Sequence, residues 1–166
     1  DKSAMDAIIR FVDCIGQKGF IAIETKYSEN LGTNVALEKD TNKPRAKSLE
    51  TVRQLKCFEP DIEDRITKGQ LKLTQIYRNF LLSESYGSRY GLESYSIILA
   101  PADHPSTGKE VDSLRDELRE EYKNKIGSIS LEDFVERIIK NCPEEYKNVF
   151  ERFRDRYLAF DKLMSL

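Results

Sequence analysis

The sequence places a carboxylate and an ammonium two residues apart at the end of an apolar run. The run Phe20–Ile23 has the composition of a buried strand, and Glu24 and Lys26 follow it. Because side chains alternate across a strand, these two charges are expected on one face. The same pattern also fits the polar end of a structural strand, where Lys26 extends to water and pairs with Glu24. A second acidic residue on that face would favour chemistry over structure.

A predicted hairpin supplies that second acid. Residues 6–12 are expected to form a strand that turns at two glycines into the Glu24 strand. With a loop of about three to five residues, Asp6 falls opposite Glu24 or Lys26, and directly opposed residues share a face. Asp13 is a competing acid, but it lies at the turn end of the hairpin. We therefore expect Asp6, Glu24 and Lys26 to converge.

This pattern resembles the Asp…(Glu/Asp)-x-Lys signature of the PD-(D/E)xK nuclease superfamily, which has the restriction-endonuclease-like fold. Met5 stands where that superfamily often has proline. The later segments QIYRNFLL (residues 75–82) and SYSIILAP (residues 94–101) are similar to a bacterial restriction-endonuclease-like subgroup, so the resemblance covers the part of the chain before residue 102. It implies that Gln75 and Arg78, on a helix beside the hairpin, contact substrate or steady the metal ligands. The resembled fold normally opens with a helix, so we expect a fragment that lacks an N-terminal helix.

Asp6, Glu24 and Lys26 are the residue types that metal-dependent hydrolysis of a phosphodiester requires. Mg²⁺ takes one or two carboxylates together with waters and phosphate oxygens, and it lowers the pKa of an attacking water. Asp6 and Glu24 are the predicted ligands of Mg²⁺ or Mn²⁺. Lys26 would orient or deprotonate the water, or stabilise the charge that develops on the phosphate. Tyr27 and Glu29 are weaker candidates for the same site.

Composition limits the other classes of protein. The 166 residues, 39% of them hydrophobic, suit one domain with one sizeable core. The sequence has no long apolar run and no secretory leader pattern, so we expect a cytoplasmic protein without a membrane span. Cys14, Cys57 and Cys142 lack metal-site or disulfide spacing and are expected to be reduced thiols. His104 is the sole histidine, which excludes a histidine-rich metal site.

The net charge of −2 does not indicate a nucleic-acid binder, but one segment is basic. From Lys39 to Lys56 six basic residues outnumber two acidic ones, which gives a local charge of +4. Such a segment could grip a phosphate backbone, or it could be a solvated loop and helix face. The polar stretch 30–44 immediately after the candidate site is expected to be a mobile loop.

Apolar spacing predicts the remaining elements. They are a helix over 47–58, a helix from about Ile66 or Gly69 to Tyr86, a strand over 94–100, and three further helices over 108–123, 130–141 and from Pro143 onward. Thr107 with Glu110 predicts a capping box, and Ser130 with Asp133 predicts an N-cap. The last helix is expected to bury a stripe that consists of Tyr146, Val149 or Phe150, Phe153, Tyr157, Phe160 and Leu163 or Met164.

Together these features predict an α/β domain over 1–166, with a small mixed sheet flanked by helices and a helical part over 108–166. The predicted function is Mg²⁺-dependent hydrolysis of DNA by Asp6, Glu24 and Lys26, with DNA as the partner and a homodimer as a further hypothesis. The alternative is a non-catalytic module with the nuclease fold that binds nucleic acid or a protein. A purely structural fragment of a larger protein is the third hypothesis. Metal binding through Asp6 and Glu24 distinguishes the catalytic hypothesis from the binding module.

Overall fold

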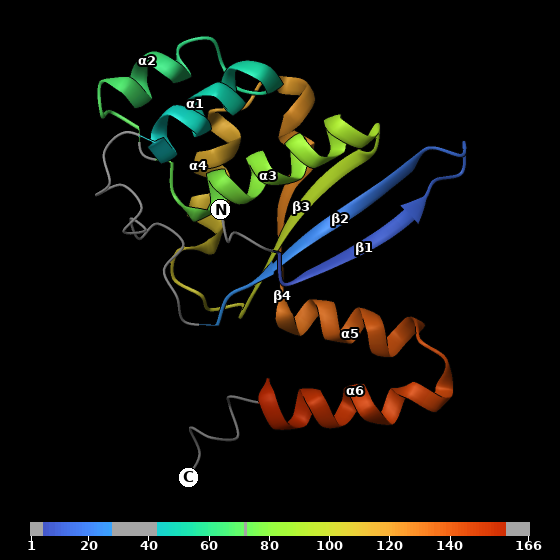
Figure 1. Ribbon diagram of the computed structural model, residues 1–166. Coiled ribbons are helices and arrows are strands. Elements are labelled where there is room, and N and C mark those ends of the chain that lie inside the picture. The colour runs from blue at the N-terminus through green and yellow to red at the C-terminus, as the bar shows by residue number, and fades with distance from the viewer. Residues whose placement is uncertain (1–4, 28–42, 72, 159–166) are drawn as a thin grey trace.

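A four-stranded mixed sheet forms the centre of the protein (Figure 1). The structure is a computed structural model that describes residues 5–27, 43–71 and 73–158, without the side chains of 43–46. The strands lie in the order β1 (Ala7–Val12), β2 (Lys18–Thr25), β3 (Glu93–Ala100) and β4 (Ile126–Ser130). β1 is antiparallel to β2, whereas β2, β3 and β4 are parallel. The predicted small mixed sheet is therefore confirmed.

Helices cover both faces of this sheet, as Figure 1 shows. On one side lie α1 (Lys43–Leu55), α2 (Ile62–Thr67), α3 (Gln75–Tyr90) and α4 (Thr107–Asp116). A 3₁₀ helix, η2 (Glu120–Lys125), leads from α4 into β4. On the other side lie α5 (Leu131–Asn141) and α6 (Glu144–Tyr157). None of the described helices is long and apolar enough to cross a membrane.

The alternation of β2 assigns each of its side chains to one of these two sides. Phe20 lies against Tyr86 of α3, with ring centroids 5.5 Å apart, and Glu24 contacts Gln75 of the same helix. Residues 20, 22 and 24 therefore point to what we call the α3 face. Ile23 points the other way and packs with Leu131 of α5, on the α5 face.

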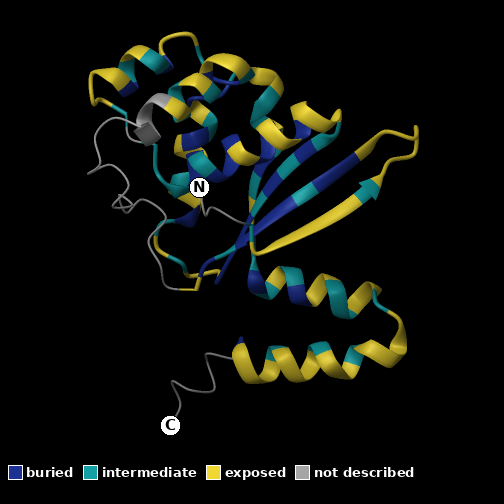
Figure 2. Cartoon of the chain, in the orientation of Figure 1, coloured by how far each residue is buried: buried dark blue, intermediate teal, exposed yellow. Residues whose placement is uncertain are grey.

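Each face has its own apolar core (Figure 2). The larger core lies between the sheet and the first four helices, and its fully buried side chains include Ile76, Phe80, Ile98, Val111, Leu114 and Leu118. The smaller core joins β2 and β3 to α5 and to the end of α6, and it consists of Ile23, Leu99, Leu131, Val135 and Leu158. Sheet strands that are covered on both sides explain why β2 and β3 are nearly continuous apolar runs.

Two predicted helices are shorter than expected. The predicted helix from Ile66 or Gly69 to Tyr86 is wrong at its start, because Gly69 adopts a left-handed φ of 73° between α2 and α3. The predicted helix over 108–123 is wrong beyond Asp116. There Leu118 forms an isolated bridge with Phe58, and the Arg119 N–H donates to the Cys57 carbonyl at 3.0 Å, so contacts with a distant segment replace the helical hydrogen bonds.

The prediction that no strand follows residues 94–100 is also wrong. β4 is five residues long, with the sequence IGSIS, and it extends the sheet next to β3. Only Ile126 and Ile129 have the β-branched composition that marks a strand, and the other three residues are a glycine and two serines. Its pairing with the edge of β3, rather than its own propensity, therefore determines its conformation.

One of the two predicted helix caps is confirmed. The Ser130 hydroxyl accepts a hydrogen bond from the Asp133 N–H at 3.0 Å, which caps α5. The predicted capping box of Thr107 and Glu110 is wrong, because the N-cap residue is Ser106 and it makes no side-chain cap bond. Thr107 Oγ1 instead lies 2.8 Å from Nδ1 of His104. The Thr107 hydroxyl thus interacts with the loop before α4 and does not form the helix cap that the sequence pattern predicted.

The predicted inner stripe of α6 is largely exposed. Tyr146, Val149, Phe153 and Tyr157 face solvent in the described part of the chain. The side of α6 that lies against α5 carries Phe150 and Arg154, and Arg154 pairs with Glu136 of α5 at 3.1 Å. α6 therefore packs through a partly polar side. Residues 160, 163 and 164 of the predicted stripe lie outside the described residues.

A partly buried charge network joins α3 to the start of β3. The Ser94 hydroxyl donates to Glu84 Oε1 at 2.6 Å, and Lys125 Nζ lies 3.8 Å from Glu84 Oε2 and 3.2 Å from Glu93 Oε2. Burial raises the pKa of Glu84 above its usual value of 4.5, although the Ser94 hydrogen bond and the Lys125 ammonium act in the opposite direction. Ionised Glu84 is thus held at a cost to the stability of the fold.

Candidate active site

Asp6 lies beside the end of β2, where Glu24 and Lys26 are found. The hairpin pairs Ala7 with Ile23, and the five-residue loop between its strands agrees with the predicted length. The Asp6 N–H donates to the Ile23 carbonyl at 3.0 Å, and the Thr25 N–H donates to Asp6 Oδ2 at 2.7 Å. The Asp6 carboxylate is therefore held at the peptide group that joins Glu24 to Thr25.

Glu24 is a buried carboxylate with two unequal oxygens. Only 5% of the residue is exposed. Its Oε1 lies 2.9 Å from Lys26 Nζ and accepts a hydrogen bond from Gln75 Nε2 at 2.8 Å. Its Oε2 is buried and has no hydrogen-bond partner among the described residues. A buried acceptor of this kind is costly unless a cation or a donor satisfies it.

Lys26 is buried as well, which corrects the expectation that it extends to water. The residue is 8% exposed, and its N–H donates to the Leu99 carbonyl at 2.7 Å. This bond continues the parallel β2–β3 pairing past Thr25, the last residue of β2. Lys26 therefore lies inside the sheet rather than beyond its end, and its ammonium is directed to Glu24.

The start of α3 contributes the predicted polar pair. Gln75, the first residue of α3, contacts Glu24 directly. Arg78 is partly buried one turn later, and its Nε has no hydrogen-bond partner in the described part of the chain. The structure also brings Thr74 to this position, as the N-cap residue of α3 with a buried, unpartnered Oγ1. Thr74 was missed, although a threonine directly before an amphipathic run is a recognised helix-start signal.

The competing acid has a structural role. Asp13 Oδ1 accepts hydrogen bonds from the N–H groups of Ile15 and Gln17, at 3.0 and 2.8 Å, and so closes the hairpin turn. Tyr27 is exposed at the end of the segment that carries Lys26. Glu29 lies outside the described residues, as do residues 30–42 of the loop expected over 30–44. The end of that expected loop is wrong, because α1 already begins at Lys43.

Part of the basic segment 39–56 is engaged in an ion pair within the protein. Arg53 on α1 makes a two-pronged ion pair with Glu63 of α2, which raises the pKa of Arg53 and lowers that of Glu63. Lys47 and Lys56 are exposed. Lys39 lies outside the described residues, and the side chains of Lys43 and Arg45 are not described.

The two acidic residues Asp6 and Glu24 are enough to hold a Mg²⁺ or Mn²⁺ ion. The described residues contain no group of three or more histidine, cysteine, aspartate or glutamate side chains that could hold a metal ion. Mg²⁺ usually keeps several waters and takes only one or two carboxylates from the protein. A buried oxygen with no partner, Glu24 Oε2, and the nearby Asp6 carboxylate therefore fit Mg²⁺ or Mn²⁺, and they do not fit a structural zinc site.

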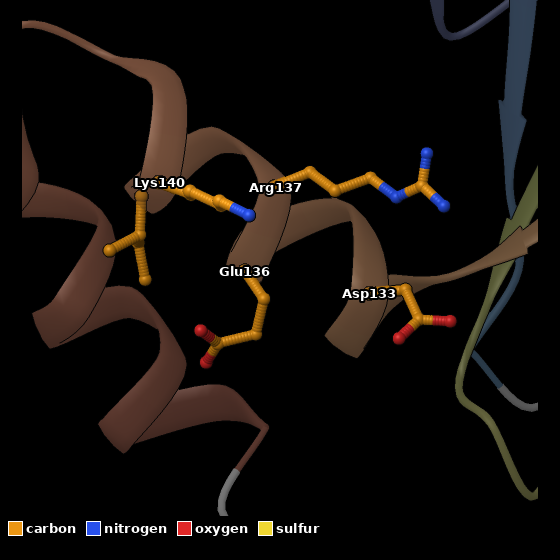
Figure 3. A pocket seen from close by; sticks show the side chains of 5 residues that line it. Asp133, Glu136, Arg137 and Lys140 are labelled. Atoms are coloured by element: carbon orange, nitrogen blue, oxygen red, sulfur yellow. The ribbon is translucent and has the colours of Figure 1, made fainter.

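A hollow in the surface of the described residues lies on the other side of the sheet. Figure 3 shows an open depression of about 410 Å³ along α5, lined by Asp133, Glu136, Arg137, Ile139 and Lys140. α5 covers the face of the sheet opposite to Glu24. In Figure 3 the Arg137 side chain extends toward the strands, whereas Glu136 extends toward α6. This depression therefore takes no part in the candidate active site.

Comparison with known proteins identifies a family that the chain matches. The chain matches the family described as "restriction endonuclease associating with ARP" over residues 1–158. No curated protein matches the chain, and no solved structure matches it. The matched range includes the hairpin, α3 and both helices on the α5 face. The chain therefore belongs to this restriction-endonuclease-like family.

Proposed function

We propose that this protein hydrolyses phosphodiester bonds in DNA and that Mg²⁺ or Mn²⁺ is required. The observation that carries the proposal is the asymmetry of Glu24, whose Oε1 is held by two donors while Oε2 is buried without a partner. Membership in a restriction-endonuclease-like family agrees with this chemistry. The PD-(D/E)xK assignment of Asp6, Glu24 and Lys26 is part of the same proposal.

The proposal gives each residue a definite task. Asp6 and Glu24 Oε2 would hold the cation, which when bound polarises the phosphoryl group and lowers the pKa of a water ligand. Gln75 and Lys26 fix the plane of the Glu24 carboxylate, so that Oε2 keeps one direction. The Lys26 ammonium, 2.9 Å from Glu24, would also stabilise negative charge on the phosphate oxygens as the bond to the leaving group breaks.

The test is metal binding and cleavage measured on the same samples of the complete protein. Wild type, Glu24→Gln and Lys140→Met are titrated with Mn²⁺ and assayed on supercoiled and linear DNA with Mg²⁺, with Mn²⁺ and with EDTA. Lys140 is an exposed lysine of α5, on the side of the sheet opposite to Glu24 and outside the basic segment, so its variant serves as the control. We expect wild type and the control to bind Mn²⁺ and cleave, and Glu24→Gln to lose both. Metal-independent cleavage, or a wild type that binds no Mn²⁺, would contradict the proposal.

A second candidate function is binding without turnover. Two observations favour it: the exposed apolar residues of α6, Tyr146, Val149, Phe153 and Tyr157, and the association with ARP that the family description names. In this hypothesis the exposed side of α6 docks a protein partner and the nuclease site is inactive. An intact wild type that cleaves no DNA with any metal, yet binds DNA or a protein partner, would favour it. A homodimer and a cytoplasmic location stay predictions.

A further inference from the structure

One side of α3, which we call its flank, begins at the candidate active site and extends away from it along the helix. Gln75, Arg78, Leu82, Tyr86 and Arg89 follow one another at intervals of three or four residues, so they lie along one side of the helix. Two contacts show where this side faces. Gln75 reaches Glu24 and Tyr86 reaches Phe20, and both partners belong to β2. The flank therefore follows β2 on the side next to the sheet edge, where β1 lies (Figure 1).

A matching row of side chains stands on β1. Ile8 pairs with Ala22, Arg10 with Phe20, and Val12 with Lys18, so Ile8, Arg10 and Val12 lie on the same α3 face as the flank of the helix. β1 is the edge of the sheet, and Ile8 and Val12 are 56% and 62% exposed. The same row continues through Asp6 to the candidate metal site.

These two rows define what we call the α3–β1 strip: Arg78, Tyr86, Arg89 and the adjoining Tyr90 from α3, and Ile8, Arg10 and Val12 from β1. All three of its charged side chains are basic, although the net charge of the whole chain is −2. Lys18, opposite Val12, adds another positive charge at the far end. Asp6 is the acid at the near end, where a metal ion would neutralise it. The strip is thus complementary in charge to a polyanion that leads away from the site.

The strip also offers aromatic surface at its far end. Tyr86 and Tyr90 are 44% and 55% exposed, and their ring centroids are 4.5 Å apart. The Arg89 guanidinium lies 5.6 Å from the centroid of the Tyr90 ring. Exposed aromatic rings beside arginines are the combination on which unpaired bases stack, whereas the bases of an intact duplex present no free face.

We propose that the α3–β1 strip binds an unpaired nucleic-acid strand, with its phosphates on the arginines and its bases on Tyr86 and Tyr90. The strand would run from the phosphodiester at Glu24 along β1. Eleven residues of helix separate Gln75 from Tyr86, or about 16 Å. This length takes at most about five nucleotides, the number that applies if the bases stay stacked at the duplex spacing of about 3.4 Å, and fewer if the strand is extended. The inference rests on the proposed function only for the near end of the strip; the binding itself needs no metal ion.

The test is fluorescence anisotropy with labelled 12-nucleotide probes in EDTA, where no metal-dependent cleavage occurs. The probes are oligo-dT, oligo-rU and a duplex of the same length, and the protein is the complete chain. We expect the single strands to bind more tightly than the duplex. Tyr90→Ala should weaken single-strand binding about 5- to 150-fold, the range measured for loss of one stacked base. Arg89→Gln should reduce the slope of log K against log salt by about 0.7.

Matched controls keep the result specific. Tyr146→Ala and Arg152→Gln remove an exposed tyrosine and an exposed arginine from α6, and they should leave binding unchanged. Tyr86→Phe should retain binding, because the ring still stacks, whereas Tyr86→Ala should lose it. Thermal melts of the Tyr86 variants show whether the contact with Phe20 affects folding.

Failure of this inference differs from failure of the nuclease proposal. Equal affinity for duplex and single strand, or alanine variants of Tyr86 and Tyr90 that bind as tightly as wild type, would overturn the strip even if the protein cleaves DNA. Single-strand binding in EDTA that needs these tyrosines would establish the strip even if no cleavage is found. The dT and rU probes tell which sugar the strip prefers.

Discussion

Replacing Lys26 by methionine should destabilise the protein far more than an ordinary surface substitution. The Lys26 and Glu24 side chains are only 10% and 6% exposed, and their charged atoms are 2.9 Å apart. Without the ammonium, Glu24 Oε1 keeps only Gln75, and Oε2 still has no partner in the described structure. Removing one partner of a buried ion pair usually costs about 3–5 kcal/mol, because the other charge is left uncompensated.

This loss of stability can be measured as a decrease in the melting temperature. For a chain of this length about 1 kcal/mol corresponds to about 2–4 °C, so Lys26→Met should lower the Tm by about 6–20 °C. Lys68→Met, at the residue directly after α2, is the matched control. Lys68 pairs with Asp64, but its side chain is 58% exposed, and exposed pairs are worth about 0–1 kcal/mol.

A double variant separates the lost charge balance from lost packing. Glu24→Gln in the Lys26→Met background removes the uncompensated carboxylate, so the double variant should be more stable than the sum of the single effects by about 0.5–3 kcal/mol. If Lys26→Met melts as close to wild type as Lys68→Met does, the argument from a buried pair is refuted. At temperatures where Lys26→Met is folded, cleavage should fall about 10²–10³-fold if the ammonium acts in the transition state.

Three further predictions test the scaffold. Burial raises the pKa of Glu84, so the native state holds this proton more tightly than the unfolded state and the free energy of unfolding falls as pH rises above 4.5. Glu84→Gln should therefore raise the Tm more at pH 8 than at pH 4, and an equal gain at both would contradict this assignment. A Cβ on Gly87 would lie 2.8 Å from a backbone carbonyl oxygen, whereas one on Gly108 meets nothing within 4 Å. Alanine should thus lower the Tm at Gly87, by about 1–3 kcal/mol in stability, and leave it equal or higher at Gly108, as thermal melts would show. Burial raises the pKa of the Cys57 thiol to about 12, so a thiol reagent at pH 8 should label exposed Cys14 quickly and Cys57 only after unfolding. Rapid labelling of Cys57 in the folded protein would contradict this prediction, because it would show that the core around Cys57 opens to solvent.

The sequence by itself determined the features that depend on neighbouring residues. Two short apolar runs joined by a glycine-containing turn were enough to predict the β1–β2 hairpin, and the hairpin placed Asp6 beside Glu24. The apolar stripe of α3 was sufficient to predict the helix, and it left Gln75 on the flank where it contacts Glu24. The Ser130 cap also follows from a local pattern. In each case the interacting residues lie within one element or in two adjacent strands.

Only the tertiary structure decided the features that depend on distant partners. Lys26 is buried because Leu99 extends the sheet past β2, and β4 exists because it pairs with β3. α4 ends where Leu118 meets Phe58, sixty residues earlier in the chain. The unpartnered oxygen of Glu24 belongs to this group too, since it results from the way α3 covers the sheet. The spacing of residue types along the chain cannot predict such contacts. Their free energy comes from the removal of apolar surface from water between two segments. The separation of those segments in sequence says nothing about whether they meet in space.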